Sequence, residues 1–179
     1  MYYSTEYPSP VGVLTLASDG AALCGLWLEG QKYHGGTIPE AMVRNDDAPA
    51  FAEAHAWLDA YFAGKRPAVA DVPLAPIGGE FRQMVWRILT EIPYGETTTY
   101  GEIAQEVARR RNGRKTAALA VGGAVGHNPV SIIIPCHRVV GADGSLTGYA
   151  GGLAKKTWLL EHEGVDMNRL YTPKKGTAL

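Results

Sequence analysis

The sequence predicts two domains: an α/β N-terminal domain with a small antiparallel sheet plus helix, joined to a mainly α C-terminal domain with a helix-turn-helix. Three observations lead to this prediction. Apolar runs flank the turn sequence Ser18-Asp19-Gly20, apolar side chains recur at helical spacing between residues 51 and 62, and prolines and glycines crowd residues 66–79. After this stretch the helical spacing of apolar residues resumes, so we place a domain boundary within it.

The first domain is expected over residues 1–76. An Asp-Gly pair between the apolar runs of residues 11–28 is typical of a tight turn joining antiparallel strands. Residues 51–62 predict an amphipathic helix that stops at Gly64. Cys24 lies in the second strand of the hairpin, with no histidine at a recognised ligand spacing. We therefore expect Cys24 to be a core residue, and we expect no metal site.

The second domain is expected over residues 77–170, and residues 171–179 form a tail with no evident fold. An apolar face over residues 81–89 predicts its first helix, and residues 153–162 predict its last, with Gly164 as the stop. Between the two, residues 141–152 include five glycines. We expect this loop to be mobile and able to wrap a ligand.

A helix-turn-helix is predicted in the middle of the second domain. Thr99 and Glu102 match a capping box that starts one helix. A basic turn follows at residues 109–115, and Thr116 is expected to cap a second helix over residues 117–125. That second helix is rich in alanine and glycine, which permits close approach of its backbone either to another helix or to the surface of a partner.

A run of three isoleucines at residues 132–134 leads to a cysteine. The run predicts a buried strand that Pro135 ends, so Cys136 is expected at a rigid strand end. Burial by itself favours an inert cysteine, because it raises the thiol pKa. His137 and Arg138, however, follow at once and supply a base and a positive charge. We therefore consider Cys136 a candidate nucleophile.

Composition and charge narrow the class of protein. The chain has 179 residues, of which 46% are hydrophobic and 20% charged, as in an ordinary globular protein. No apolar run approaches the ~20 residues of a membrane span, and the first residues lack the features of a signal peptide. We therefore expect an intracellular, cytoplasmic protein. With only two cysteines, a disulfide framework is not expected and a reduced thiol can persist.

The net charge of -1 conceals a strong asymmetry. Residues 1–80 contain 4 Lys+Arg against 10 Asp+Glu, a net charge of -6, whereas residues 81–179 contain 13 against 8, a net charge of +5. The basic part of the chain is the part that contains Cys136. Because phosphate contact depends on local charge, this asymmetry favours a nucleic-acid-facing second domain.

Several motifs of the second domain resemble one family. They are Asn128-Pro129, Ile134-Pro135-Cys136-His137-Arg138-Val139, Gly148-Tyr149-Ala150-Gly151-Gly152, Trp158-Leu159-Leu160 and His162-Glu163-Gly164. The chain resembles the alkylguanine-DNA alkyltransferases, also called methylated-DNA-protein-cysteine methyltransferases, over roughly residues 71 to 170. The resemblance implies direct-reversal DNA repair, in which an alkyl group moves from guanine O-6 in flipped-out DNA to the cysteine.

The resemblance also implies the catalytic residues. Cys136 would be the alkyl acceptor, and His137 would take its proton through a bridging water. Glu163 would orient the imidazole of His137. Tyr100 matches the tyrosine that donates a proton toward the guanine ring. Asn128 matches the asparagine that ties the helix-turn-helix to the active-site turn.

Two further sets of residues follow from the resemblance. The pocket for the flipped base would consist of Val139, Tyr149, Ala150, Gly151 and Trp158. The DNA contacts would come from Thr99, Arg114, Lys115, Thr116, Ala117, Leu119, Ala120 and Gly123.

The sequence departs from the family pattern at Leu119. The family usually has an arginine at this position of the recognition helix, where it enters the duplex in place of the flipped nucleotide. We predict that Leu119 acts as an apolar wedge instead, with Arg114 and Lys115 holding phosphates. The alternative is that Leu119 faces the domain core. The turn before the helix is also longer and more basic than the family pattern.

The chemistry implies a protein that acts once. A thioether has no easy route back to the thiol, so the protein would be a stoichiometric acceptor, with no cofactor and no metal. We expect a monomer whose partner is double-stranded DNA carrying alkylated guanine, found in the nucleoid or nucleus through that DNA and not at a membrane. The resemblance leaves open whether O-4-alkylthymine is also repaired. The alternatives are a lesion-sensing or regulatory DNA-binding protein and a cysteine hydrolase.

Overall fold

The computed structural model describes residues 1–174. The chain divides into two compact units, and the division is not a single cut. Unit 1 consists of Met1–Gly78 together with Pro129–Ile133, and unit 2 consists of Gly79–Asn128 together with the chain from Ile134 onward. The sequence predicted two domains that are each continuous in the chain. In the structure, residues 129–133, shortly before Cys136, belong to unit 1 instead of unit 2.

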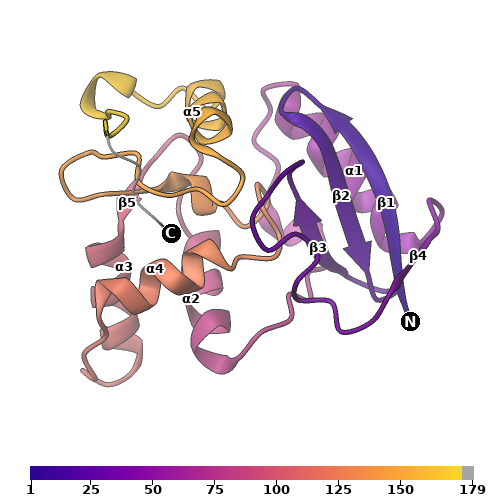
Figure 1. The fold of residues 1–179 in the computed structure, drawn as a ribbon, viewed down its shortest axis with the longest axis horizontal. Coiled ribbons are helices and arrows are strands. Elements are labelled where there is room, and N and C mark those ends of the chain that lie inside the picture. The colour runs from indigo at the N-terminus through magenta and orange to yellow at the C-terminus, as the bar shows by residue number, and fades with distance from the viewer. Residues whose placement is uncertain (175–179) are drawn as a thin grey trace. The chain divides into compact units, whose positions relative to one another are not determined.

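Unit 1 contains a four-stranded sheet covered on one face by a helix (Figure 1). The strands β1 (Tyr2–Ser9), β2 (Gly12–Ser18), β3 (Leu23–Trp27) and β4 (Met42–Arg44) lie in the order β3-β2-β1-β4. The pairs β1-β2 and β2-β3 are antiparallel, and β4 adds a parallel edge strand that the sequence did not predict. Helix α1 (Pro49–Phe62) packs on the sheet through a buried face.

The predicted hairpin is the pair β2-β3. Its turn is fixed by the Asp19 carboxylate, which accepts hydrogen bonds from the backbone N–H groups of Ala21 (2.9 Å) and Ala22 (2.8 Å). Cys24 in β3 is 1% exposed, so its placement in the core is confirmed. The buried face of α1 includes Trp57. The apolar stripe predicted from the sequence did not contain this residue, since it consisted of Phe51, Ala54, His55, Leu58 and Phe62.

The strand predicted for residues 132–134 is not formed. All three isoleucines are buried, as expected, but they lie in turns. One residue of the segment, Val130, pairs with Leu26 of β3 through an isolated parallel bridge. The pairing ends there because Ile132 adopts a φ of 71°, a conformation incompatible with a strand and unfavourable for a β-branched residue. Burial, rather than sheet pairing, accounts for the apolar run.

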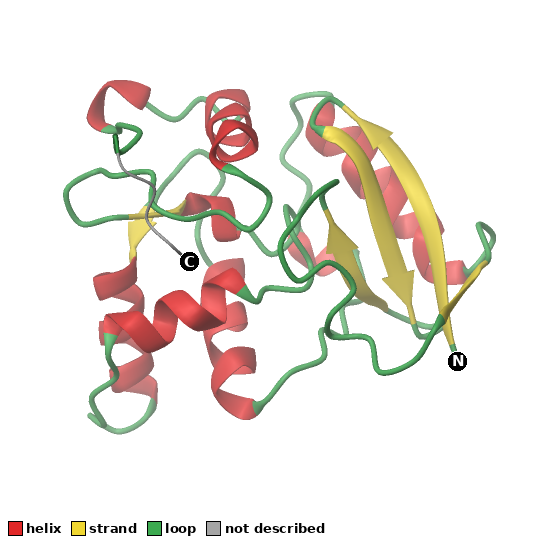
Figure 2. Cartoon of the chain, in the orientation of Figure 1, coloured by secondary structure: helices red, strands yellow, loops and turns green. Residues whose placement is uncertain are grey.

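Unit 2 is mainly helical (Figure 2). Its helices are α2 (Glu80–Thr90), α3 (Tyr100–Arg110), α4 (Ala118–Gly126) and α5 (Leu153–His162), and the strands β5 (Thr98–Thr99) and β6 (Val139–Val140) form a small parallel pair. Helices α2, α3 and α4 pack against one another, and the indole N–H of Trp86 donates to the carbonyl of Ala124 at 2.9 Å. Short 3-10 turns occur in unit 2 at Cys136–Arg138 and Met167–Arg169, and in unit 1 at Val69–Asp71.

The two predicted caps of the helix-turn-helix have opposite outcomes. The capping box of α3 is present: Thr99 Oγ1 accepts from the N–H of Glu102 (3.1 Å), and the Glu102 carboxylate accepts from the N–H of Thr99 (2.9 Å). The prediction that Thr116 caps α4 is wrong. The N-cap is Ala117, because the Thr116 hydroxyl instead accepts from the guanidinium of Arg111 at 3.2 Å.

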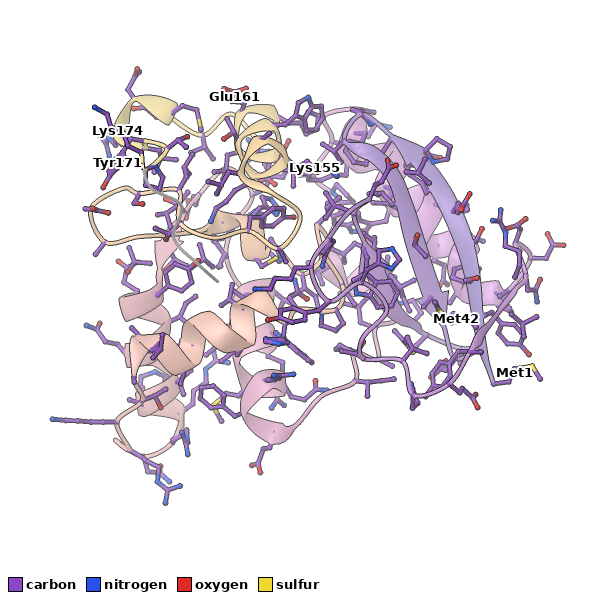
Figure 3. The ribbon with its side chains drawn as sticks, viewed as in Figure 1. Met1, Met42, Lys155, Glu161, Tyr171 and Lys174 are labelled. Atoms are coloured by element: carbon purple, nitrogen blue, oxygen red, sulfur yellow. The ribbon has the colours of Figure 1, made fainter. Side chains whose placement is uncertain are left out.

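The end of unit 2 packs on α5. Val140, Leu146 and Leu160 form a buried cluster there. The predicted tail is anchored at its first residue, because the N–H of Tyr171 donates to the carbonyl of Gly144 (3.1 Å) and the two segments form a bridge (Figure 3). The rest of the predicted tail, from residue 175, lies outside the described residues. Across residues 1–174, no helix combines the length and apolarity required to cross a membrane.

Candidate active site

Cys136 begins a 3-10 turn formed by Cys136–Arg138. The residue before it, Pro135, has φ −82° and ψ 65°, and the N–H of Cys136 donates back to the carbonyl of Ile134 at 2.8 Å. These dihedral angles and this hydrogen bond define an inverse γ-turn. Cys136 is 6% exposed and is therefore held by two consecutive turns, not by the strand end that the sequence predicted.

Three charged or titratable side chains converge beside the cysteine. His137 Nε2 lies 2.5 Å from Glu163 Oε2, and both side chains are fully buried. Arg138 Nε donates to Glu163 Oε1 at 2.7 Å, and its Nη2 reaches Oε2 at 3.2 Å. Glu163 thus joins two side chains of the 3-10 turn to the end of α5. Arg138 was predicted to supply charge, but this bidentate pairing was not foreseen.

The backbone completes the bonding of this network. The N–H of Gly95 donates to Glu163 Oε1 at 3.1 Å, and Arg138 Nη1 donates to the carbonyl of Ile92 at 2.7 Å. Burial by itself raises the pKa of Glu163, but the hydrogen bonds from His137 and Arg138 outweigh burial and hold that pKa well below its ordinary value. Glu163 is therefore ionised at neutral pH.

His137 is the candidate base. Burial lowers its pKa, against the opposing effect of Glu163, so the ring is neutral at pH 7. Since Nε2 lies against a carboxylate, we assign the proton of the neutral ring to Nε2. The other ring nitrogen, Nδ1, has no hydrogen-bond partner among residues 1–174, so its lone pair can accept a proton.

Asn128 follows the C-terminus of α4 and borders the cysteine. Its Nδ2 donates to the carbonyl of Ile134 at 2.8 Å, which ties the end of the helix-turn-helix to the turn before Cys136. Burial raises the pKa of the Cys136 thiol, while the hydrogen bond from Asn128 and the positive charge of Lys156 act in the opposite direction. Asn128 thus has both a structural and an electrostatic connection to the cysteine.

Tyr100 is the first residue of α3 and points toward the glycine-containing loop. Its hydroxyl donates to the carbonyl of Thr147 at 3.1 Å, and burial raises the pKa of the phenol to about 12. The same carbonyl accepts from Lys156 Nζ at 3.2 Å. Tyr100 is therefore neutral at pH 7 and carries a proton.

The predicted pocket residues flank this arrangement. Val139 and Tyr149 are buried, while Ala150 and Gly151 are partly exposed in the loop before α5. Trp158 lies on α5, where its ring stacks on that of His162 with centroids 4.9 Å apart.

The predicted DNA contacts form a second group, on α4 and the turn before it. Leu119 is 89% exposed, and Ala120 and Gly123 are exposed on the same side of the helix. Val121, Ala124 and Val125 form its buried face instead. The alternative that Leu119 faces the core is therefore wrong. Of the remaining predicted contacts, Arg114, Lys115 and Ala117 are exposed, and Thr99 and Thr116 are partly exposed.

Family models match both parts of the chain. Residues 1–76 match the ribonuclease-like domain of 6-O-methylguanine DNA methyltransferase, and residues 80–165 match its DNA binding domain. The chain belongs to the 6-O-methylguanine DNA methyltransferase family. This result agrees with the resemblance carried by the Pro-Cys-His-Arg-Val motif.

Relatives within the family match nearly the whole chain. The methylated-DNA–protein-cysteine methyltransferase of Methanosarcina acetivorans is 47% identical over 165 residues, which is 92% of this chain and 99% of the relative. The protein of the same name from Haemophilus influenzae is 43% identical over 161 residues, covering 90% and 86% of the two chains. A crystal structure of Mycobacterium tuberculosis OGT in complex with DNA has a TM-score of 0.75 and 44% identity, and covers 94% of each chain.

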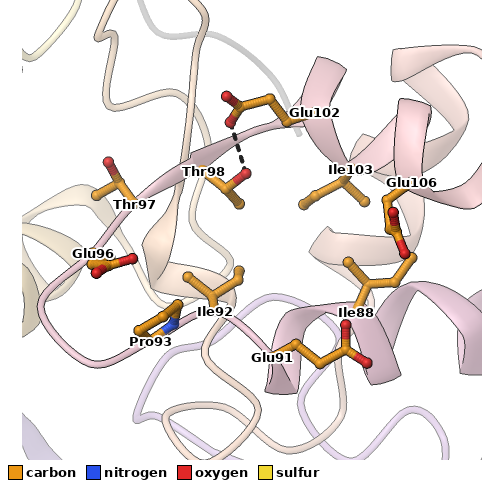
Figure 4. Close-up of a pocket in the computed structure, with 10 residues that line it drawn as sticks. All are labelled: Ile88, Glu91, Ile92, Pro93, Glu96, Thr97, Thr98, Glu102, Ile103 and Glu106. Atoms are coloured by element: carbon orange, nitrogen blue, oxygen red, sulfur yellow. Dashed lines mark hydrogen bonds between the residues drawn. The ribbon is translucent and has the colours of Figure 1, made fainter.

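A surface hollow in unit 2 is lined by residues of α2, of α3 and of the segment between them, and Cys136 is not among its lining residues (Figure 4). It has a volume of about 390 Å³ and is lined by Glu91, Glu96, Glu102 and Glu106 over a floor that includes Ile88 and Ile103. Glu91 and Glu106 are paired with Arg109 and Arg110, but Glu96 and Glu102 add further carboxylates and no lining residue is basic, so we do not assign DNA to this hollow. No group of three potential metal ligands occurs within residues 1–174.

Lys156 was not predicted from the sequence as a residue of the site. It is fully buried on α5, and its Nζ donates to the carbonyl of Val139 at 2.6 Å. In the sequence it appears as the second residue of an ordinary Lys-Lys pair on the predicted last helix. The available signal was its position on the helix, four residues before the buried Leu160 and three before the buried Leu159.

Proposed function

We propose that this protein repairs DNA by transferring an alkyl group from guanine O-6 to the sulfur of Cys136, once per molecule. The observation that carries the proposal is a buried cysteine followed directly by a histidine whose Nε2 lies 2.5 Å from an ionised carboxylate. Cys136, His137 and Glu163 thus supply a nucleophile, a base and a group that orients the base. Membership of the family supplies the reaction class.

In the proposed reaction the thiol proton of Cys136 passes to Nδ1 of His137, directly or through one water. The thiolate attacks the alkyl carbon, so an S–C bond forms and the O–C bond breaks, and its electron pair remains on the guanine. Tyr100 provides a proton to the departing guanine, which leaves as the neutral base. His137 then releases the proton that it took and Tyr100 regains the proton that it gave, so over the whole reaction the thiol loses one proton and the guanine gains one.

The product explains why the protein acts once. A thioether has no exchange route with a second thiol, and the only other cysteine, Cys24, is buried in the sheet of unit 1. We assign the base pocket to Val139, Tyr149, Ala150, Gly151 and Trp158. Asn128 would hold the turn before Cys136 in place while the base enters.

The proposed DNA-binding surface is the exposed face of α4 with the preceding turn. Small side chains at Ala120 and Gly123 allow close approach of the helix to a groove, and Arg114 and Lys115 supply charge for phosphates. The 89% exposed Leu119 would fill the space that the flipped nucleotide leaves. Flipping costs a few kcal/mol, which these contacts would offset.

We also propose that the substrate is double-stranded and that the protein acts as a monomer, because the residues assigned to the reaction and to the base pocket all lie within one compact unit of the chain. Since its substrate is genomic DNA, we place it inside the cell. The lesion-sensor alternative would leave the buried cluster around Cys136 without a role.

A stoichiometry experiment tests the proposal. Protein is incubated with increasing excess of duplex DNA containing O-6-[³H]methylguanine, and protein-bound label is counted. We expect the label to reach a plateau of one methyl group per protein molecule, at any DNA excess. Continued turnover, or DNA binding with no transfer of label, would contradict the assignment and would favour a hydrolytic enzyme or a lesion sensor respectively.

A further inference from the structure

Lys156 is a lysine buried among backbone carbonyl groups. It is 0% exposed, and its Nζ donates to the carbonyls of Val139 (2.6 Å), Thr147 (3.2 Å) and Gly148 (3.4 Å). These three hydrogen bonds join α5 to β6 and to the loop that precedes Tyr149. An ammonium group has three donors, and all three are used here.

This ammonium has no carboxylate partner. Within residues 1–174, no Asp or Glu oxygen lies within ion-pair distance of Lys156 Nζ. The other buried charges of the site cancel, since Arg138 pairs with Glu163 and His137 is neutral. The buried cluster therefore has one uncompensated positive charge. A buried charge of this kind is costly unless an anion accompanies it.

The geometry places that charge beside the 3-10 turn that contains Cys136. Val139, whose carbonyl accepts the shortest of the three hydrogen bonds, also closes the 3-10 turn by donating its N–H to the carbonyl of Cys136. The Lys156 ammonium is thus two hydrogen bonds away from the backbone of the nucleophile. The anion that can form at this position is the Cys136 thiolate.

We propose that Lys156 is a positioning residue of the reaction: its ammonium is the counter-charge of the Cys136 thiolate and holds the pocket loop against the turn that contains the nucleophile. The assignment rests on the proposed function only for its use in repair, because the pairing of the two charges is a property of the protein without DNA. It gives a specific task to a side chain that the proposed reaction does not otherwise use.

The acid–base properties of the site agree with this pairing. The positive charge of Lys156 lowers the pKa of the Cys136 thiol, against the larger effect of burial. Burial lowers the pKa of Lys156 to about 8, and the charge on Cys136 acts to raise it. The other groups facing the pair are His137, Arg138 and Glu163 from the network and the phenol of Tyr100. At pH 7 Lys156 is mainly protonated and able to stabilise the anion.

The first test measures the thiol without DNA. In a Cys24→Ala background, the rate of Cys136 alkylation by iodoacetamide is measured from pH 5 to 10 in the parent, Lys156→Met and Lys156→Arg. We expect Lys156→Met to move the pH profile upward by about one unit, a roughly tenfold slower reaction at pH 7, with rates converging at high pH. Lys156→Arg should retain most of the parent profile.

Lys155→Met is the matched control, because it removes the same charge from the neighbouring position on α5 (Figure 3). It should leave the profile in place. A Lys156→Met profile that keeps its midpoint and loses only amplitude would indicate a purely structural role and would overturn the proposal. Because no DNA is present, this result is independent of whether the protein repairs alkylguanine.

A second measurement covers the case in which Lys156→Met does not fold. The side chain of Lys156 is titrated by ¹³C NMR in the wild-type protein before and after methylation of Cys136 with methyl iodide. A neutral thioether cannot act as a counter-ion, so we expect Lys156 to titrate at a lower pH after methylation. The same titration midpoint in both forms would overturn the proposal without any substitution.

Discussion

The two cysteines of this chain lie in contrasting surroundings. Cys24 in β3 is 1% exposed and Cys136 is 6% exposed, and burial raises the pKa of both thiols. Around Cys24 burial and then the negative charge of Asp19 raise the thiol pKa to about 11. Around Cys136 the charge of Lys156 and the amide of Asn128 act to lower it.

The comparison teaches that burial does not distinguish a reactive cysteine from an inert one. The sign of the neighbouring charge and the presence of a base do. Cys24 is buried in the edge strand β3 and has a negatively charged neighbour, Asp19. Cys136 is followed by a base with a free lone pair on Nδ1 and has a positive neighbour. The same residue type therefore has two chemistries in one chain.

The largest difference between the two cysteines should appear when each is replaced by serine. Cys136→Ser should abolish alkyl transfer, because a serine hydroxyl is far less acidic and less nucleophilic than a thiol. Cys24→Ser should retain transfer, since it changes only the core of unit 1. Protein-bound label from methylated duplex DNA measures both. Transfer that survives in Cys136→Ser and disappears in Cys24→Ser would reverse the roles that we assign.

The next largest effect should come from Glu163→Gln. His137 loses the carboxylate that orients it and stabilises its protonated form, so single-turnover transfer should slow by about 10² to 10⁴-fold. Arg138 also loses its only anionic partner within the described chain, so we expect the free energy of unfolding to fall by ~3–5 kcal/mol. Rates are compared at a temperature at which the variant is folded.

Glu161→Gln is the control for this substitution, because Glu161 lies two residues earlier, on the exposed side of α5 (Figure 3). It should change neither rate nor stability. DNA binding should be preserved in both variants. If Glu163→Gln transfers at the wild-type rate, His137 does not act through this carboxylate.

How much of this site the sequence predicts depends on the range of the interactions. The capping box at Thr99 and the helix stop at Gly164 depend on a few neighbouring residues, and both are found, with Gly164 at a φ of 78°. The cap at Thr116 failed because a competing donor, Arg111, takes its hydroxyl. Local motifs are thus predictable until another side chain competes for the same atom.

The isoleucine run shows a second limit. Its burial was predicted, but the positive φ of Ile132 depends on the return of residues 129–133 to unit 1, which no local pattern encodes. The buried position of Lys156 likewise depends on carbonyls supplied from residues 139, 147 and 148, and lysine is seldom buried. The motif was sufficient to predict Cys136 as the nucleophile. The charged groups around Cys136 could be identified only from the fold.

A smaller effect on the repair rate is expected at Leu119. This residue concerns how the base reaches Cys136, and not the reactivity of the sulfur. Leu119→Ala should slow repair in duplex DNA by about fivefold, because the vacated space is filled less well. Reaction with free O-6-benzylguanine should stay unchanged. The melting temperature should also stay unchanged, since the side chain is 89% exposed. An equal loss of rate with duplex DNA and with the free base would show that Leu119 does not act as a wedge.

The smallest effect should come from single basic residues of the turn. Arg114→Ala should weaken DNA binding for all sequences alike and reduce the slope of log K against log salt by about one. Lys65→Ala removes an exposed charge from unit 1 and serves as the control, with no change in slope. Binding is measured by fluorescence anisotropy over a range of salt concentrations. An unchanged slope for Arg114→Ala would place the phosphate contacts elsewhere.

The most direct test of the contrast between the two cysteines is mass spectrometry after one reaction. Protein is incubated with an excess of duplex DNA containing O-6-methylguanine, its intact mass is measured, and the peptides containing Cys24 and Cys136 are sequenced. We predict one added methyl group, located on the sulfur of Cys136, with Cys24 unmodified. A methyl group on Cys24, or an unmodified protein alongside repaired DNA, would contradict the account.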